Sequence, residues 1–260
     1  MDLLILFVFI LSGIIGIGHG ADLLWGIDPV TGLCTVGSVW WRYAALGAVL
    51  LAALLAGRRS TALSDSVRCR RPLAGALAFA GAVCFLAAGV TQLLFAAGIS
   101  ALVRAVLQLL CGGWLFCLGR SWLTQKPWAP PTRSLVPAVF GTVVFYWNVL
   151  MCFMENSSSW HRVQPTAAVW QQMAAVLFLE ALLHALYLPE TENSKTLGAA
   201  GLAAFALCLC WQLPQTLFVL LTEGAALYLV PELASGLGLC CVGCMGGICA
   251  VKCWKEKHAK

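Results

Sequence analysis

The sequence alternates between long apolar runs and short polar segments, and eight of the apolar runs are long enough to cross a membrane as helices. They cover about residues 3–24, 39–57, 74–95, 101–118, 135–153, 166–188, 196–221 and 225–251. A hydrocarbon core of roughly 30 Å requires about 20 apolar residues in a helix. Strands of a membrane barrel would alternate between apolar and polar positions, whereas these runs are continuously apolar. The pattern predicts an all-α, polytopic membrane helix bundle with residues 1–260 in a single domain.

Three of the runs leave an alternative open. The first could be a signal peptide, but Met1-Asp2 supplies no basic residue before it and the run exceeds about 15 residues. We therefore interpret it as a retained span. The last two runs are interrupted by Pro214, Glu223, Pro231 and Glu232. A re-entrant last segment, or a seven-span arrangement, is the alternative to eight continuous spans.

Composition narrows the class of protein further. Hydrophobic residues make up 61% of the 260 residues, and charged residues only 10%. A soluble domain carries roughly 25% charged residues, so a soluble enzyme, a disordered chain and a secreted disulfide scaffold are excluded. The net charge of +5 is spread over several short connections. Because it does not form one basic patch, the lipid bilayer rather than nucleic acid is the expected partner.

The basic residues predict the orientation of the spans, because cytoplasmic loops carry an excess of lysine and arginine. Most of the 16 basic residues fall in alternate connections and after the last run. This face holds Arg58, Arg59, Arg68, Arg70, Arg71, Arg120, Lys126, Arg133, Lys195, Lys252, Lys255, Lys257 and Lys260. The other face keeps only Arg42, Arg104 and Arg162. Both termini are therefore predicted to be cytoplasmic, in the plasma (cytoplasmic) membrane.

Ionisable and amide side chains inside the predicted spans are candidate functional residues, because burying them in lipid is costly. Counting about 1.5 Å per residue along each helix sorts them by depth. An outer layer near the non-cytoplasmic face comprises His19, Asp22, Arg104, Gln108 and Asn148. Asp22 is the expected partner of Arg104, which shares its depth. Two interpretations stay open: a vestibule that binds a small solute, or a structural Asp–Arg pair near the interface.

A second polar layer lies toward the cytoplasm in the sixth run. Glu180 and His184 are four residues apart and so share one face of the predicted helix. A carboxylate beside an imidazole can relay a proton or coordinate a cation, and the alternative is a polar contact between helices. A zinc site would need at least three convergent ligands, so neither a metal nor another cofactor is predicted.

The segment Trp211-Gln212-Leu213-Pro214-Gln215 resembles the Pro-Gln signature of PQ-loop transporters. In that family, a proline kinks a span beside the substrate path. The family carries the motif in each of two repeats, whereas only one copy occurs here. From the residues themselves, Pro214 and Gln215 predict a helix kink with freed backbone carbonyls.

The last apolar run is rich in cysteine and glycine. Cys240, Cys241, Cys244, Cys249 and Cys253 lie among several glycines without paired CxxC units. Small residues at this density indicate a close helix contact, so the last span is a candidate interface for a homo- or hetero-oligomer. Cys34 and Cys152 fall near the same predicted face, and a disulfide between them is one alternative to two thiols.

No HExxH, GxSxG or P-loop motif occurs, and no enzymatic activity is expected. The favoured hypothesis is a multi-pass membrane protein that binds or transports a small solute, with Glu180 and His184 as candidates for proton coupling. The alternative is a non-catalytic assembly subunit that packs against partner helices.

Overall fold

The computed structural model describes residues 3–28, 33–58, 67–95, 98–124, 128–155, 162–188, 193–224 and 226–255. Every regular element within these residues is a helix, and eight helices are long and apolar enough to cross a membrane. The first six are α1 (Leu3–Trp25), α2 (Val39–Gly57), α3 (Pro72–Leu94), α4 (Ile99–Leu123), α5 (Val136–Glu155) and α6 (Val163–Tyr187). The predicted helical bundle and its eight spans are confirmed.

The last two spans are continuous but composite. The seventh joins α7 (Ser194–Ala204), the π-helical segment η2 (Phe205–Trp211) and α8 (Gln212–Glu223). The eighth joins the 3-10 turn η3 (Leu227–Leu229) and α9 (Val230–Lys255). Both are long and apolar enough to cross a membrane, which favours the eight-span interpretation over the seven-span alternative.

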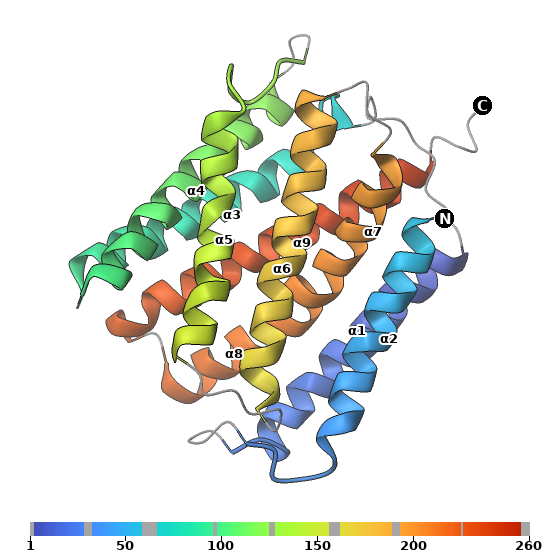
Figure 1. The fold of residues 1–260 in the computed structure, drawn as a ribbon, viewed down its shortest axis with the longest axis vertical. Coiled ribbons are helices and arrows are strands. Elements are labelled where there is room, and N and C mark those ends of the chain that lie inside the picture. The colour runs from blue at the N-terminus through green and yellow to red at the C-terminus, as the bar shows by residue number, and fades with distance from the viewer. Residues whose placement is uncertain are drawn as a thin grey trace.

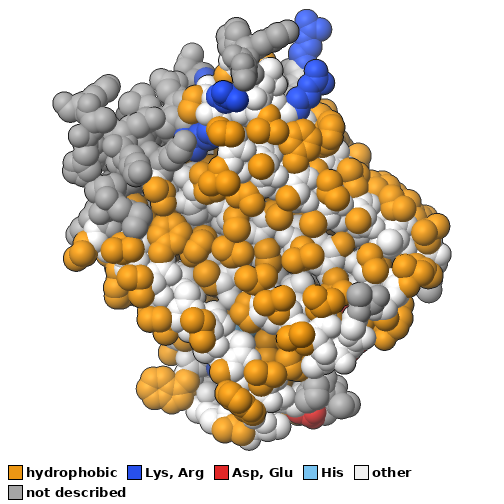
Figure 2. Space-filling view, turned by 180° about the vertical axis from the view of Figure 1, so that it is seen from behind, with side chains coloured by type: hydrophobic (Ala, Val, Ile, Leu, Met, Phe, Trp, Pro, Cys, Tyr) orange, Lys and Arg blue, Asp and Glu red, His pale blue; other side chains and the backbone are white. Residues whose placement is uncertain are grey.

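The outer surface of the bundle is apolar around its middle. Large side chains such as Ile17, Trp41 and Leu221 point outward, each more than three-quarters exposed. Figure 2 shows hydrophobic side chains spread over the middle of one face, with the visible Lys and Arg side chains gathered mainly at its upper end. Soluble monomers rarely expose such large contiguous apolar surfaces. The chain is therefore an integral membrane protein.

Helix α9 crosses the centre of the bundle, where it packs against α3, α7, η2 and α8. Figure 1 shows α3 and α4 on one side of it, α1 and α2 on the other, and α5 and α6 in front. Glycines allow the close approach: a Cβ on Gly246 would lie 2.6 Å from the carbonyl oxygen of Gly201 on α7. Gly238 and Gly247 similarly pack against the rings of Phe85 and Phe205. This small-residue face, a candidate oligomer interface in the sequence, is occupied within the chain.

The seventh span is irregular one to two turns before Pro214 rather than at it. Proline has no backbone N–H, so the carbonyl one turn earlier loses its α-helical donor. The backbone of η2 widens to π geometry over the preceding residues, and α8 then continues through Pro214. Within η2, Leu207 O also accepts a hydrogen bond of 3.2 Å from Gln171 Nε2 on α6. The distortion is thus tied to a neighbouring span by a specific side chain.

The described part of the connection between α2 and α3 is docked onto the ends of α4 and α6. Arg71 N donates to Trp122 O at 2.9 Å, and Trp122 Nε1 donates to Val67 O at 3.1 Å. Arg68 Nε donates to Ala185 O at 3.0 Å, in the last turn of α6. Cations favour the carbonyl ends of helices, where the dipole is negative. Arg59, Lys126, Lys257 and Lys260 of the predicted basic face lie outside the described residues.

Candidate functional sites

The predicted outer polar layer is divided between two separate cavities. His19 and Asp22 line a cavity of about 430 Å³ formed by α1, α2, the connection between them and Trp211 of η2. Arg104 and Asn148 line another of about 230 Å³, formed by α3, α4, α5, α6, α8 and α9. We call these the aromatic cavity and the polar cavity. Gln108, one turn after Arg104 on α4, is fully buried and lines neither.

The partner of Asp22 is Arg42 rather than Arg104, which corrects the pairing predicted from depth. Arg42 Nε donates to Asp22 Oδ2 at 2.6 Å, and Arg42 Nη2 donates to Asp22 Oδ1. The prediction was wrong because residue counting gives depth along a helix but not the neighbour across it. Helix α1 packs against α2, whereas α4 packs against α3 and α5. A bidentate guanidinium–carboxylate pair is also the strongest geometry available to these groups.

Backbone carbonyls complete the surroundings of Arg42. Val36 O and Ser38 O accept from its guanidinium at 3.0 and 3.4 Å, so the arginine ties the α1–α2 connection to both helices. Ser38 caps the N-terminus of α2, where its hydroxyl accepts from Trp40 N. Gly26 is required beside this pair, since a Cβ there would collide with the Asp22 carboxylate. The charge pair therefore organises this end of the first helical hairpin.

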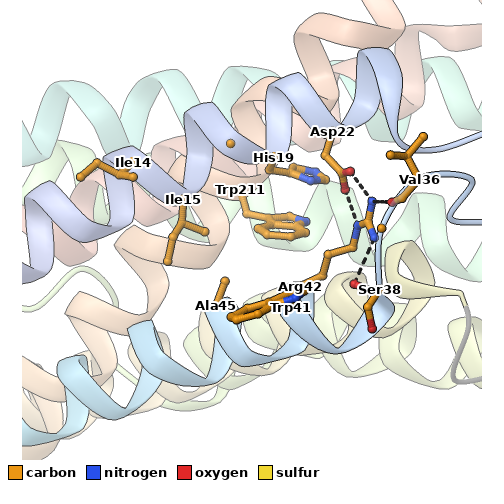
Figure 3. A pocket seen from close by; sticks show the side chains of 12 residues that line it. Ile14, Ile15, His19, Asp22, Val36, Ser38, Trp41, Arg42, Ala45 and Trp211 are labelled. Atoms are coloured by element: carbon orange, nitrogen blue, oxygen red, sulfur yellow. Dashed lines mark hydrogen bonds and ion pairs between the residues drawn. The ribbon is translucent and has the colours of Figure 1, made fainter.

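The imidazole of His19 stacks on the indole of Trp211 inside the aromatic cavity. Their ring centroids lie 3.7 Å apart with an interplanar angle of 12°. Figure 3 shows the two rings one above the other, with Asp22 and Arg42 toward one end of the cavity and Ile14 and Ile15 toward the other. Neither imidazole nitrogen, nor Trp211 Nε1, has a hydrogen-bond partner among the described residues.

The polar cavity gathers charged and amide side chains from five helices. Its polar lining comprises Arg104, Asn148, Gln171, Gln172, Gln212, Gln215, Glu232 and Ser235. Arg104 and Glu232 carry opposite charges but form no ion pair with each other. Arg104 Nε and Asn148 Oδ1 are buried without a partner among the described atoms. Hydrogen-bonding capacity in this cavity thus exceeds what the chain itself uses.

Several of these side chains are held in place by their neighbours. Asn148 Nδ2 donates to Gln172 Oε1 at 3.3 Å, which joins α5 to α6. Gln212 Nε2 donates to Thr216 Oγ1 at 3.1 Å within α8. The amide of Gln171, which lines the cavity, donates to Leu207 O of η2, and Gln212 and Gln215 of the cavity lining directly follow η2 in the seventh span.

The predicted inner pair lies on the outward face of the bundle. Glu180 and His184 are both exposed on α6 and line a cavity of about 270 Å³ with Leu135 and with Val139 of α5. Tyr146 on α5 donates its hydroxyl hydrogen to Glu180 Oε1. The pair shares no lining residue with the polar cavity. Its proposed role in proton coupling stays a prediction.

Cysteines and metal ligands supply no further site in the part of the chain that the structure describes. No group of three or more His, Cys, Asp or Glu side chains there is placed to hold a metal ion. Cys34 and Cys152 are not joined as a disulfide. Cys253, from the cysteine-rich last run, lies in α9, where its backbone alone is described.

Sequence reasoning missed the roles of Arg42 and Trp211, and it identified Glu232 only as one of several ionisable residues within the predicted spans. In the sequence, Arg42 contributes only to the predicted orientation of the spans. Its place in the first turn of α2 nevertheless allows it to reach α1. Glu232 was noted as an interruption of the last run, yet it lies in the first turn of α9, where a carboxylate favours the helix dipole. The signal that could have found the polar cavity was the recurrence of glutamine inside the sixth and seventh runs.

Comparison with known proteins assigns no family: no family model matches the chain, and no match was found among curated proteins or among solved structures. The fold and the surface nevertheless define its class. It is a multi-pass helical membrane protein with polar groups buried between its spans.

Proposed function

We propose that the protein binds a small polar solute in the polar cavity and carries it across the membrane without catalysing a reaction. The observation that supports this most is that Arg104 and Glu232 line one cavity without pairing to each other. Arg104 is only partly exposed between the spans, where an uncompensated charge is costly, and Glu232 is exposed at the start of α9; a solute that carries the complementary charges can pair with both. Zwitterions, with a carboxylate facing Arg104 and an ammonium facing Glu232, are the matching class.

The size and surroundings of the cavity restrict the solute further. About 230 Å³ is below the roughly 300–1,000 Å³ of cavities for drug-sized ligands, so the solute is of amino-acid size. The amides of Asn148, Gln172 and Gln215 supply neutral donors and acceptors around it. Transporters commonly place substrates beside an interrupted helix, and η2 interrupts the seventh span next to this cavity.

Binding is tested with purified protein in detergent, by thermal unfolding against a panel of free amino acids, betaine, acetate and methylammonium. Zwitterions should raise the Tm, and the singly charged analogues should not. Arg104→Gln and Glu232→Gln should each weaken binding by about tenfold or more, equivalent to about 1.4 kcal/mol. Glu223→Gln is the matched control, because Glu223 is exposed at the end of α8 and outside the cavity. Unchanged affinity in both cavity variants would overturn the proposal.

Proton coupling through Glu180 and His184 forms a second part of the proposal, and it rests on their i, i+4 spacing and on the Tyr146–Glu180 hydrogen bond. In proteoliposomes that take up the bound zwitterion, an inwardly directed proton gradient should accelerate uptake. Glu180→Gln and His184→Ala should abolish that acceleration while leaving solute binding intact. Equal acceleration in wild type and both variants would exclude Glu180 and His184 from proton coupling without contradicting the proposed solute site.

A further inference from the structure

We propose that the aromatic cavity is a lipid site, which binds a neutral membrane amphiphile through a hydroxyl group. This site is distinct from the polar cavity and shares no lining residue with it. Its apolar end is formed by Ile14, Ile15 and Ala45, and its polar end by His19, Asp22 and Arg42 (Figure 3). Such a graded lining suits a molecule with one polar group on a long apolar body.

The unpartnered ring nitrogens of His19 and Trp211 indicate which polar group of a ligand the cavity can bind. His19 is 3% exposed and Trp211 is 4% exposed, yet their ring nitrogens have no hydrogen-bond partner among the described residues. Leaving such groups unpaired in an apolar medium costs free energy. A neutral imidazole offers one donor and one acceptor, and an indole offers one donor. A hydroxyl group, which both donates and accepts, complements this set.

The charges beside His19 are already neutralised, which argues for an uncharged ligand. Arg42 is engaged by both carboxylate oxygens of Asp22 and by two backbone carbonyls. No other charged side chain lines this cavity. A fatty-acid carboxylate or a quaternary ammonium would therefore add an unpaired charge, whereas an alcohol would not.

The position of the cavity provides a route from the lipid phase. Helices α1 and α2 lie side by side at one edge of the bundle (Figure 1). Ile14 and Trp41, which line the cavity, are 62% and 78% exposed on the surface that faces lipid. An amphiphile can enter sideways, with its apolar body continuous with the surrounding acyl chains.

The test uses photoactivatable probes in lipid nanodiscs: a diazirine-bearing long-chain alcohol, its methyl ether and the matching fatty acid. After irradiation, mass spectrometry maps the labelled peptides. The alcohol should label α1, α2 or η2 at least fivefold more than the ether, which accepts but cannot donate, and more than the acid. Equal labelling by alcohol and ether, stronger labelling by the acid, or no labelling of these segments would overturn the proposal.

Substitution of His19 tests whether its imidazole binds the hydroxyl group of the alcohol probe. His19→Phe keeps a ring to stack on Trp211 but removes both nitrogens, and it should reduce alcohol labelling to the level of the ether. His184→Phe is the matched control, because His184 lies on α6 outside this cavity. Labelling of His19→Phe at the wild-type level would exclude the imidazole as the recognition group. Should that variant fail to fold, the comparison of the three probes on the wild-type protein decides the question.

Discussion

Arg42 shows how a charged residue is accommodated near the end of a span. Its guanidinium is engaged by four acceptors, two on Asp22 and one each on Val36 and Ser38. The side chains of Arg42 and Asp22 are only 12% and 20% exposed, so solvent screens the pair weakly. The bond joins α1 to α2 at the point where the chain turns between them. Removing either partner would leave a charge without compensation.

Replacing Arg42 by methionine should lower the free energy of unfolding by about 3 kcal/mol, because the Asp22 carboxylate is then left without a positively charged partner in a partly buried site. The measurement is thermal or denaturant unfolding of the purified protein in detergent. The double variant Arg42→Met with Asp22→Asn should recover most of the loss, because no charge is then left unpaired. If the double variant is as unstable as the single one, the pair contributes through packing rather than charge.

At the residue scale, counting residues along a span predicts the depth of a side chain but not which neighbouring helix it faces. His19 and Asp22 lie near one end of α1, where the helical rise places them. Their actual partners, Trp211 and Arg42, come from helices whose positions around the bundle no residue count could supply. Side-chain recognition within a bundle depends on which helix faces are opposed. Packing between spans determines which faces are opposed, and hydropathy along a single span does not.

At the scale of elements, glycine determines how closely α7 and α9 approach. Gly201 and Gly246 face each other so tightly that a Cβ on either would lie 2.6 Å from the other's carbonyl oxygen. Without a strong hydrophobic driving force in lipid, close backbone contact of this kind is a main source of helix association. The small residues of the last span thus place α9 at the centre of the molecule.

Gly246→Ala should destabilise the protein by about 1–3 kcal/mol, because the added methyl group must push apart two backbones that cannot rotate away. Gly113→Ala on α4 is the control: nothing lies within 4 Å of a Cβ there, so its stability should equal or slightly exceed that of wild type. The assay is fluorescence-detected size-exclusion chromatography after heating. Equal Tm values for the two variants would contradict the tight α7–α9 contact.

The spans themselves were predictable because the bilayer imposes their length and composition. Most predicted ends lie within two or three residues of the observed ones, and α2 coincides with its prediction. The largest difference is at the end of α4, which continues to Leu123 past the polar pair Arg120-Ser121. Hydropathy falls there, but Trp122 is fully buried against the α2–α3 connection and extends the helix. The π geometry of η2 had no sequence signal beyond the nearby proline.

At the scale of the whole molecule, the distribution of charge distinguishes the two ends of the bundle. Exposed arginines such as Arg58, Arg70, Arg120 and Arg133 lie at the end where α2 and α4 finish and α3 and α5 begin. The aromatic and polar cavities lie toward the opposite end. If the positive-inside rule holds, that opposite end faces outward and both cavities are reached from outside.

Cys34 and Cys69 test this orientation, because they lie in consecutive connections on opposite faces. A membrane-impermeant maleimide should label Cys34 in intact cells and Cys69 only after permeabilisation. Burial raises the pKa of the Cys34 thiol. Because the thiolate is the reactive form, Cys34 should label slowly at neutral pH and faster as the pH rises toward that pKa.

The control for Cys34 is Thr35→Cys, an exposed neighbour that should label on the same side without the delay. Labelling of Cys69, but not of Cys34 or position 35, in intact cells would reverse the orientation of the bundle.

Transport through the polar cavity requires that water and small solutes reach it from the end of the bundle opposite the exposed arginines. The most direct measurement is chemical modification of Ser235→Cys by a small charged methanethiosulfonate reagent added from outside, with the modified peptide identified by mass spectrometry. Ser235 lines the cavity, whereas Ser12 is 1% exposed in the core of α1 and Ser12→Cys serves as the inaccessible control. We expect rapid modification at position 235, slowed by a bound zwitterion, and none at position 12. Absence of modification at position 235 in folded protein would contradict transport through the polar cavity.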